Sequence, residues 1–334
     1  MDNEIFLEAK NLSFGYLKRP LTLKDINFSV LNGEKVLLLS SREMGKTTFL
    51  SVVSSFESNY QGEILLKGKE LKSINDAEKN FSLLPNNPVF FENKTILLNV
   101  NYLLSVNKMQ NYNEEKLNSY LKTKNFSKKS NVKIKALTVC EKRILSILRS
   151  LLKNPDCIFI DDMFALLDEE DKEKIKYLYI EELAKRDTNV FFAFGDTTYK
   201  NCKDVINKLH ISKVLYLFDA TMVEFSSIND FENNIVNANQ MLFFDKKNYI
   251  KGDILLKDGN YYFEKDSEII KLDKLNDDIL CKIVNLNLEN YDAEEVTVYF
   301  NENEIDDFQL IKFQDLLNLK KVMIFSVLDG SRIV

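Results

Sequence analysis

The stretch VLLLSSREMGKTTFL, residues 36–50, runs from an apolar segment through a short loop into a segment with helical character. Residues 36–39 have no polar face, which is typical of a strand covered on both sides in a parallel sheet. The loop ends in GKTT, residues 45–48, and a strand, a loop with this ending and a helix together predict a phosphate-binding loop. Glycines normally open such a loop so that backbone N–H groups can approach the phosphates, but Ser40 and Glu43 stand in their places. The stretch therefore predicts a phosphate site that is altered in sequence.

The composition is that of a soluble globular protein with two domains. The chain has 334 residues, of which 45% are apolar and 29% are charged, and this length exceeds that of an average domain. No run of about 18 apolar residues occurs that could form a transmembrane helix. The opening MDNEIFLEAK is acidic and unlike a secretory signal. We therefore expect a cytoplasmic protein.

Histidine and cysteine usage argues against several classes of site. His210 is the only histidine, so metallohydrolase centres and His-based catalytic triads are not expected. The cysteines are widely scattered and form no CxxC pair, which argues against a zinc site or a disulfide framework: Cys140, Cys157, Cys202 and Cys281.

The net charge of −6 is unevenly distributed along the chain. Residues 241–334 contain 12 Lys/Arg against 19 Asp/Glu, whereas the remainder is close to neutral. An acidic region is repelled by phosphate backbones and by anionic membrane surfaces. Nucleic acid is therefore not an expected partner.

Strand and helix signals alternate over the first two thirds of the chain. Residues 4–16 alternate in polarity and predict a strand, and residues 61–71 predict a hairpin. The Asn32-Gly33 pair is of the hairpin type and predicts a turn between the strand that precedes it and the apolar strand that follows. Further strands are predicted at 157–161, 189–196 and 213–219, and helices at 47–56, about 97–135 and 142–152. Such alternation predicts an α/β fold with a mostly parallel sheet.

The character of the sequence changes after Asn239. Residues 252–265 predict a hairpin around Asp258-Gly259, and residues 294–300 predict a further strand. We therefore expect one domain over residues 1–238 and a small β-rich domain over residues 239–334.

Taken together, these segments resemble the nucleotide-binding subunits of the ATP-binding-cassette (ABC) family. The resemblance covers about residues 4–232 and rests on the order and spacing of motifs, most of which are altered. It implies a P-loop NTPase cassette with a helical subdomain at about 97–150, with ATP and Mg²⁺ as cofactors. A regulatory role for the C-terminal domain is implied only by analogy with accessory β-domains of the family.

The resemblance assigns roles around the phosphate loop. Tyr16 stands where the family stacks an aromatic ring on adenine, and its position favours this role slightly over that of a tyrosine filling a strand. Gly45, Lys46, Thr47 and Thr48 match the end of the loop, with Lys46 expected on the β/γ-phosphates and Thr47 on Mg²⁺.

The altered positions in the loop carry two expected costs. Ser40 and Glu43 must adopt a backbone conformation that is easy for glycine and strained for other residues. Glu43 also brings negative charge near a polyphosphate, and two unit charges about 4 Å apart repel by roughly 4 kcal/mol at a surface-like dielectric. Arg42 would offset part of this repulsion, unless the Glu43 side chain points outward.

Two further motifs are altered. Asn86, in LLPNNPVFF, replaces the glutamine of the Q-loop and keeps the amide on a shorter side chain. LTVCE, residues 137–141, aligns with the LSGGQ signature, but Val139 and Cys140 replace both glycines and Glu141 adds a carboxylate. This segment either binds a partner's ATP poorly or serves only as a helix start.

The acidic strand end CIFIDD, residues 157–162, resembles Walker B. Asp161 matches the acid that orients Mg²⁺, and Asp162 stands in place of the catalytic glutamate, as a weak candidate base. Gly195 occupies the position of the switch histidine and has no side chain to offer.

These residues predict the ATP-binding subunit of an ABC transport complex that binds nucleotide weakly and hydrolyses it poorly or not at all. The expected partners are integral membrane permease subunits, which would hold it on the inner face of the membrane, and a second cassette, in a homodimer or a heterodimer with an active cassette. A non-hydrolysing scaffold on a membrane complex is the competing interpretation. A cassette that acts on nucleic acid is a weaker one, because no basic stripe is present.

Overall fold

The computed structural model describes two compact units, Met1–Phe231 and Glu232–Val334. The described residues are 4–17, 21–41, 44–76, 78–165, 167–234, 236, 240, 243–244, 249–257, 260–265, 268–271, 293–299 and 323–326, with the backbone alone from 249 onward. The predicted boundary at 238/239 stays a prediction.

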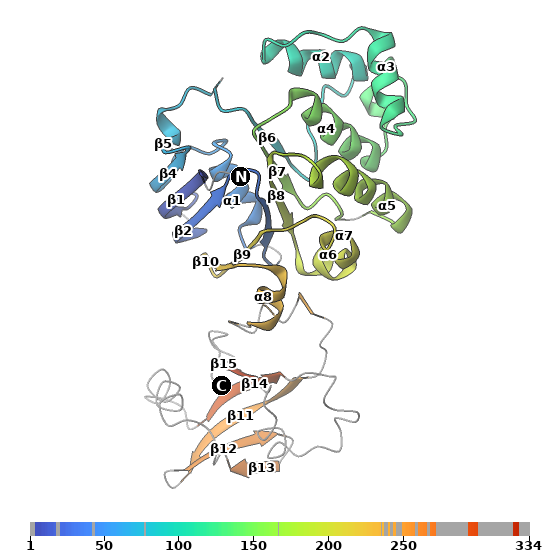
Figure 1. Ribbon diagram of the computed structural model, residues 1–334. Helices are drawn as coiled ribbons and strands as arrows, with labels where there is room; N and C mark the ends of the chain where they lie inside the picture. The colour runs from blue at the N-terminus through green and yellow to red at the C-terminus, as the bar shows by residue number, and fades with distance from the viewer. Residues whose placement is uncertain are drawn as a thin grey trace. The chain divides into compact units, whose positions relative to one another are not determined.

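A six-stranded sheet is the centre of the first unit (Figure 1). Its strand order is β10-β9-β3-β8-β7-β6, and all neighbouring pairs are parallel except β10 with β9. The strands are β3 (Lys35–Leu39), β6 (Phe81–Leu84), β7 (Cys157–Asp161), β8 (Asn189–Phe194), β9 (Lys213–Phe218) and β10 (Thr221–Phe225). Every residue of β3 is buried, as its lack of a polar face predicted. The predicted α/β fold with a mostly parallel sheet is confirmed.

A second, antiparallel sheet has the order β2-β1-β4-β5, and its strands are β1 (Ile5–Phe14), β2 (Leu23–Leu31), β4 (Gln61–Leu66) and β5 (Lys69–Glu70). The predicted hairpin at 61–71 is the β4–β5 pair. The predicted turn at Asn32-Gly33 is confirmed, with Gly33 at φ +78°, but its hairpin type is wrong, because β2 and β3 belong to different sheets. The physical reason is that β2 buries roughly alternate residues, whereas β3 must be covered on both faces.

The helices of the first unit fall into two groups (Figure 1). One group lies with the sheets and consists of α1 (Lys46–Val53), α6 (Asp196–Asn201), α7 (Lys203–Ile206) and α8 (Ile228–Asn233). The other group lies together and consists of α2 (Ile96–Val106), α3 (Glu114–Thr123) and α4 (Val139–Lys153). Helix α4 also packs against α5 (Glu169–Leu178). A π-helical turn, Tyr179–Ala184, extends α5, and short 3₁₀ turns span Leu71–Ser73 and Ile134–Ala136. Among the helices that the structure describes, none is both long enough and apolar enough to cross a bilayer.

Aromatic packing fixes the position of α1 against the two sheets. Phe49 on α1 lies 5.4 Å from Phe28 on β2, measured between ring centroids. Phe28 in turn lies 6.5 Å from Phe191 on β8, and Phe191 stacks on Phe159 of β7 at 5.0 Å. All four rings are buried in one cluster. Burial of each ring contributes roughly 1.5–3 kcal/mol, so the helix that follows the phosphate loop is firmly anchored.

The second unit contains a five-stranded sheet of order β13-β12-β11-β14-β15. Its strands are β11 (Tyr249–Lys257), β12 (Asn260–Lys265), β13 (Glu268–Lys271), β14 (Ala293–Tyr299) and β15 (Met323–Ser326), all paired antiparallel. The pairing of Lys257 with Asn260 closes the predicted hairpin, although residues 258–259 themselves lie outside the described residues. The strand predicted at 294–300 is β14.

Candidate functional site

The side chain of Lys46, at the start of α1, contacts the backbone just after β3. Its Nζ donates to the carbonyl oxygens of Ser40 at 2.7 Å and Ser41 at 2.9 Å. Gly45 caps α1 in a left-handed conformation, with φ +94°. A Cβ atom at Gly45 would lie 3.0 Å from Cγ2 of Thr22 and 3.3 Å from its carbonyl oxygen. Both the backbone angle and the space therefore require glycine here.

The strain expected at Ser40 is absent. Ser40 is not among the non-glycine residues with positive φ. Its N–H donates to the carbonyl of Phe194 at 3.4 Å, and it is fully buried. The expectation was wrong because Ser40 continues the extended backbone of β3 beside β8. Arg42 and Glu43 lie outside the described residues, so the charge effects expected of them stay predictions.

Thr47 and Asp161 meet at the carboxyl ends of the parallel strands. The Thr47 hydroxyl donates to Oδ2 of Asp161 at 2.7 Å. Burial raises the pKa of Asp161, and the hydrogen bond from Thr47 opposes that rise. Hydroxyl and carboxylate oxygens are hard ligands that suit Mg²⁺, which binds proteins through one or two such groups together with substrate phosphates. These two residues therefore fit the metal role that the sequence predicted for them.

Around Lys46, the residues of the site that the structure describes carry more negative than positive charge. Burial lowers the pKa of Lys46, and the neighbouring carboxylates of Asp162, Asp161 and Asp196 oppose that shift. Three carboxylates near one amine repel a polyphosphate unless a divalent cation accompanies it. Binding of a nucleotide at this site should therefore depend strongly on Mg²⁺.

Asp162 is directed toward the start of α6. The Thr198 hydroxyl lies 2.8 Å from Oδ1 and 3.0 Å from Oδ2 of Asp162, and the Gly195 N–H donates to Oδ2 at 3.3 Å. Burial raises the pKa of Asp162, while these hydrogen bonds lower it. The sequence pointed to Asp162 and Gly195 but gave no reason to single out Thr198, which contacts Asp162 across 36 residues.

Tyr16 lies beside the first turn of α1. Its hydroxyl is 3.3 Å from the hydroxyl of Thr48, and its ring meets that of Phe14 edge-on at 5.1 Å. The side chain is 43% exposed. An aromatic face at the edge of the loop is compatible with stacking on a base, and this role stays a prediction.

Arg143 is a residue of this site that the sequence analysis did not single out. It projects from α4, and its guanidinium donates to three backbone carbonyls, those of Asn86 at 2.8 Å, Met163 at 2.9 Å and Ala165 at 2.6 Å. The signal available in the sequence was a basic residue on the apolar face of an amphipathic helix, where arginine is rarely buried unless it is hydrogen-bonded. Arg143 is only 2% exposed.

A cleft of 510 Å³ gathers most of the predicted residues. It is lined by Lys46, Thr47, Asn86, Asp161, Asp162 and Gly195, together with residues of α6 and of the segment after β7. Tyr16, Gly45 and Thr48 are not in its lining, although Tyr16 and Thr48 contact each other next to it.

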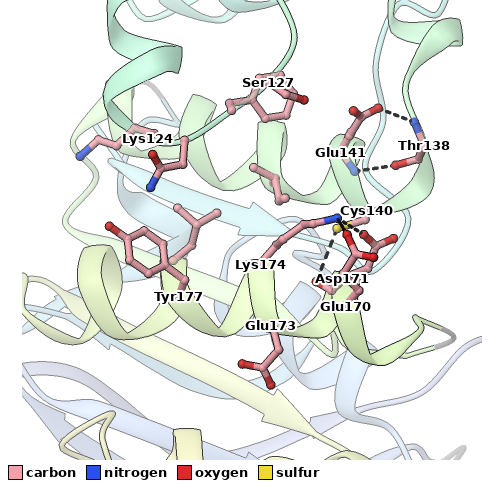
Figure 2. Close-up of a pocket in the computed structure, with 14 residues that line it drawn as sticks. Lys124, Ser127, Thr138, Cys140, Glu141, Glu170, Asp171, Glu173, Lys174 and Tyr177 are labelled. Carbon is pink, nitrogen blue, oxygen red and sulfur yellow. Dashed lines mark hydrogen bonds and ion pairs between the residues drawn. The ribbon is translucent and has the colours of Figure 1, made fainter.

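The segment aligned with the signature forms a capped helix start (Figure 2). The Thr138 hydroxyl accepts from the N–H of Glu141 at 3.1 Å, and the Glu141 carboxylate accepts from the N–H of Thr138 at 2.9 Å. This reciprocal pair is a capping box that satisfies two N–H groups at the helix terminus. Burial raises the pKa of the Cys140 thiol to about 12. The local geometry therefore favours the interpretation as a helix start.

A pocket of 570 Å³ lies beside this helix start, between α4, α5 and residues 124–127 (Figure 2). Each charged group of its lining has an ion-pair partner, either in the lining or outside it. Lys174 pairs with Glu170 and Asp171, and Lys124 pairs with Glu182.

Comparison with known proteins finds a family model and several relatives that this chain resembles. Residues 23–165 match the family model described as ABC transporter. A putative ABC transporter ATP-binding protein of Clostridium tetani is 27% identical over 175 residues, which is 52% of this chain and 40% of the relative. The molybdate/tungstate import ATP-binding protein WtpC of Pyrococcus horikoshii is 27% identical over 170 residues, 51% of this chain and 49% of the relative. The spermidine/putrescine import ATP-binding protein PotA of Mycoplasma mycoides is 25% identical over 266 residues, 79% of this chain and 73% of the relative. The chain thus spans less than half the length of the first two relatives.

Proposed function

We propose that the chain is the ATP-binding subunit of a transport complex, with a site that binds Mg-ATP weakly and hydrolyses it slowly, because residues 23–165 match the ABC transporter family model. The observation that carries this proposal is the cleft in which Lys46, Thr47 and Asp161 lie together. Lys46 would hold the β/γ-phosphates, and Thr47 and Asp161 would hold Mg²⁺. A bound Mg²⁺ would supply positive charge to the phosphates.

Weak affinity for nucleotide follows from the hydrogen bonds that Lys46 must give up when it binds a phosphate. Its ammonium already donates to two loop carbonyls, so a phosphate replaces existing hydrogen bonds instead of making wholly new ones. The excess of carboxylates adds repulsion that Mg²⁺ must offset. Both effects lower the net gain on binding without abolishing it.

Slow hydrolysis follows from the groups around the position of the attacking water. A general base must lie within hydrogen-bond reach of that water. Asp162 is one methylene shorter than a glutamate, and its oxygens accept hydrogen bonds from Thr198 and Gly195. Gly195 has no side chain with which to contact a γ-phosphate.

Integral membrane permease subunits are the proposed partners, and the helical part of the first unit is the proposed contact. On α2 the side chains of Leu98, Tyr102 and Val106 are 53%, 56% and 64% exposed. Their spacing of four residues places them on one helix face. An exposed apolar row of this kind supports a protein interface, which would hold the chain peripherally at the inner face of the membrane.

Arg149 supports an interface beside the same helices. Its guanidinium carbon lies 4.4 Å from the centre of the Phe90 ring, and it has no hydrogen bond or ion pair within the described part of the chain. Burial lowers its pKa to about 10. Arg149 lines a 340 Å³ mostly apolar pocket that Phe56 and Val89 border and that Thr47 and Asp161 of the candidate site also line. An acidic side chain of a permease subunit would supply an ion-pair partner for this guanidinium.

Equilibrium binding tests the proposal. Isothermal titration of the full chain with ATP, with and without Mg²⁺, should show weak binding that nearly disappears without the metal. The absence of binding at millimolar Mg-ATP would leave the non-hydrolysing scaffold as the function, since the fold and the apolar surface on α2 would remain.

Phosphate release tests the hydrolytic part separately. The chain alone should release phosphate very slowly, and the double variant Asp162→Glu with Gly195→His should release it faster. A Cβ at position 195 would lie 3.4 Å from Oδ2 of Asp162, which is an ordinary van der Waals contact. Turnover that appears only when an intact cassette is added would support a heterodimer. Robust turnover by the unmodified chain that requires Lys46 would contradict the proposal.

A further inference from the structure

The carboxylate of Asp162 accepts several hydrogen bonds at the start of α6. Thr198, on α6, places its hydroxyl within 3.0 Å of both Asp162 oxygens, and the Gly195 N–H reaches one of them. The Thr198 residue is only 8% exposed. The contact therefore lies in a protected position where water competes weakly for the hydroxyl.

The geometry lets one hydroxyl serve two acceptors. A threonine hydroxyl has a single proton, and its two distances to Asp162, 2.8 and 3.0 Å, are nearly equal. The carboxylate can therefore tilt slightly without losing this partner. A base must instead direct an oxygen at the attacking water, and doing so would cost Asp162 these hydrogen bonds.

We propose that Thr198 is a positioning residue that holds Asp162 against the start of α6 and thereby restrains it from acting as a base. This inference rests on the proposed function for its consequence in turnover, but the contact itself exists without nucleotide. Gly195 contributes by leaving its N–H and the adjoining space to the same carboxylate. The slow hydrolysis of the site then has a second origin besides the short side chain of Asp162.

Two substitutions separate the hydroxyl from the rest of the side chain. Thr198→Val keeps the shape of threonine and removes the hydroxyl, whereas Thr198→Ser keeps the hydroxyl and removes the methyl group. Asp162→Ala removes both acceptor oxygens. Each is made in the full chain and combined in the double variant Thr198→Val with Asp162→Ala.

Urea unfolding of the nucleotide-free chain tests the contact. With Asp162 present, Thr198→Val should lower the equilibrium constant for folding by about tenfold to a hundredfold, the range for a hydrogen bond to a charged group. The same change in the Asp162→Ala background should have much less effect. Equal effects of Thr198→Val in the two backgrounds would overturn the proposal.

Phosphate release at saturating Mg-ATP tests the restraint. We expect Thr198→Val to raise kcat several-fold with KM unchanged, and Thr198→Ser to keep the wild-type rate. The rise in kcat should vanish in the double variant Thr198→Val with Asp162→Ala. A protein that binds Mg-ATP but whose kcat does not rise on Thr198→Val overturns the restraint. Failure of the wild type to bind Mg-ATP contradicts the proposed function instead, and the unfolding measurements then decide alone whether Thr198 holds Asp162.

Discussion

Gly45→Ala tests the conformation of the phosphate loop. An alanine at φ +94° occupies the left-handed region, which costs roughly 1–2 kcal/mol relative to glycine. Its Cβ would also lie 3.0 Å from the Thr22 methyl carbon and 3.3 Å from the Thr22 carbonyl oxygen. Crowding of this kind typically costs a further 1–3 kcal/mol, and we expect a cost of about 1 kcal/mol because a methyl group can shift. The total of about 2–3 kcal/mol predicts a Tm lower by about 4–12 °C for the first unit.

Gly68→Ala is the matched control for this substitution. Gly68 also has a left-handed backbone, with φ +76°, but no atom lies within 4 Å of a Cβ placed there. Differential scanning calorimetry of both variants therefore separates the backbone cost from the crowding at Thr22. Gly45→Ala should also weaken Mg-ATP binding, whereas Gly68→Ala should not. Equal Tm losses, or an unchanged affinity in Gly45→Ala, would refute the reasoning about the loop.

Three further measurements address the site. Lys46→Met should weaken Mg-ATP binding by roughly 10- to 150-fold in calorimetry, the equivalent of one charged hydrogen bond. The control Lys185→Met, which removes an exposed ion pair with Glu181, should leave the affinity unchanged. A normal affinity in Lys46→Met would show that Lys46 does not bind the phosphates. Thr138→Ala should lower the Tm by about 2–4 °C through the loss of its helix cap, worth about 1 kcal/mol, and an unchanged Tm would contradict the role of the capping box. Cys140, with its thiol pKa raised to about 12, should resist iodoacetamide at pH 8, where the thiolate is scarce, and become reactive above pH 11 or in urea. Peptide mass spectrometry measures the extent of labelling. Rapid labelling of the folded chain at pH 8 would show that the thiol is not protected.

Local pattern was sufficient to predict the central features of the first unit. The apolar run at residues 36–39 predicted a strand covered on both faces, and every residue of β3 is buried. The acidic end of residues 157–162 could be placed near the phosphate loop because the carboxyl ends of parallel strands meet at one edge of a sheet. Thr47 and Asp161 are accordingly hydrogen-bonded, although 114 residues separate them.

Contacts that depend on side-chain direction could not be predicted in the same way. The Asn32-Gly33 turn is real, but the membership of its two strands in different sheets depends on what covers each strand elsewhere in the fold. Thr198 reaches Asp162 only because α6 begins immediately after β8. The relaxed backbone at Ser40 likewise depends on its pairing with β8, which no pattern near residue 40 encodes.

The hydrogen bonds of Arg143 have a consequence for how the sequence of this chain can drift. Its guanidinium binds the backbone carbonyls of positions 86, 163 and 165, so the side chains at those positions are not the groups that it recognises. Asparagine can therefore stand at position 86 without loss of the link between that loop and α4. Positions 86, 163 and 165 can therefore accept other side chains, whereas position 143 cannot. Replacing Arg143 would leave three carbonyls without their donor at once.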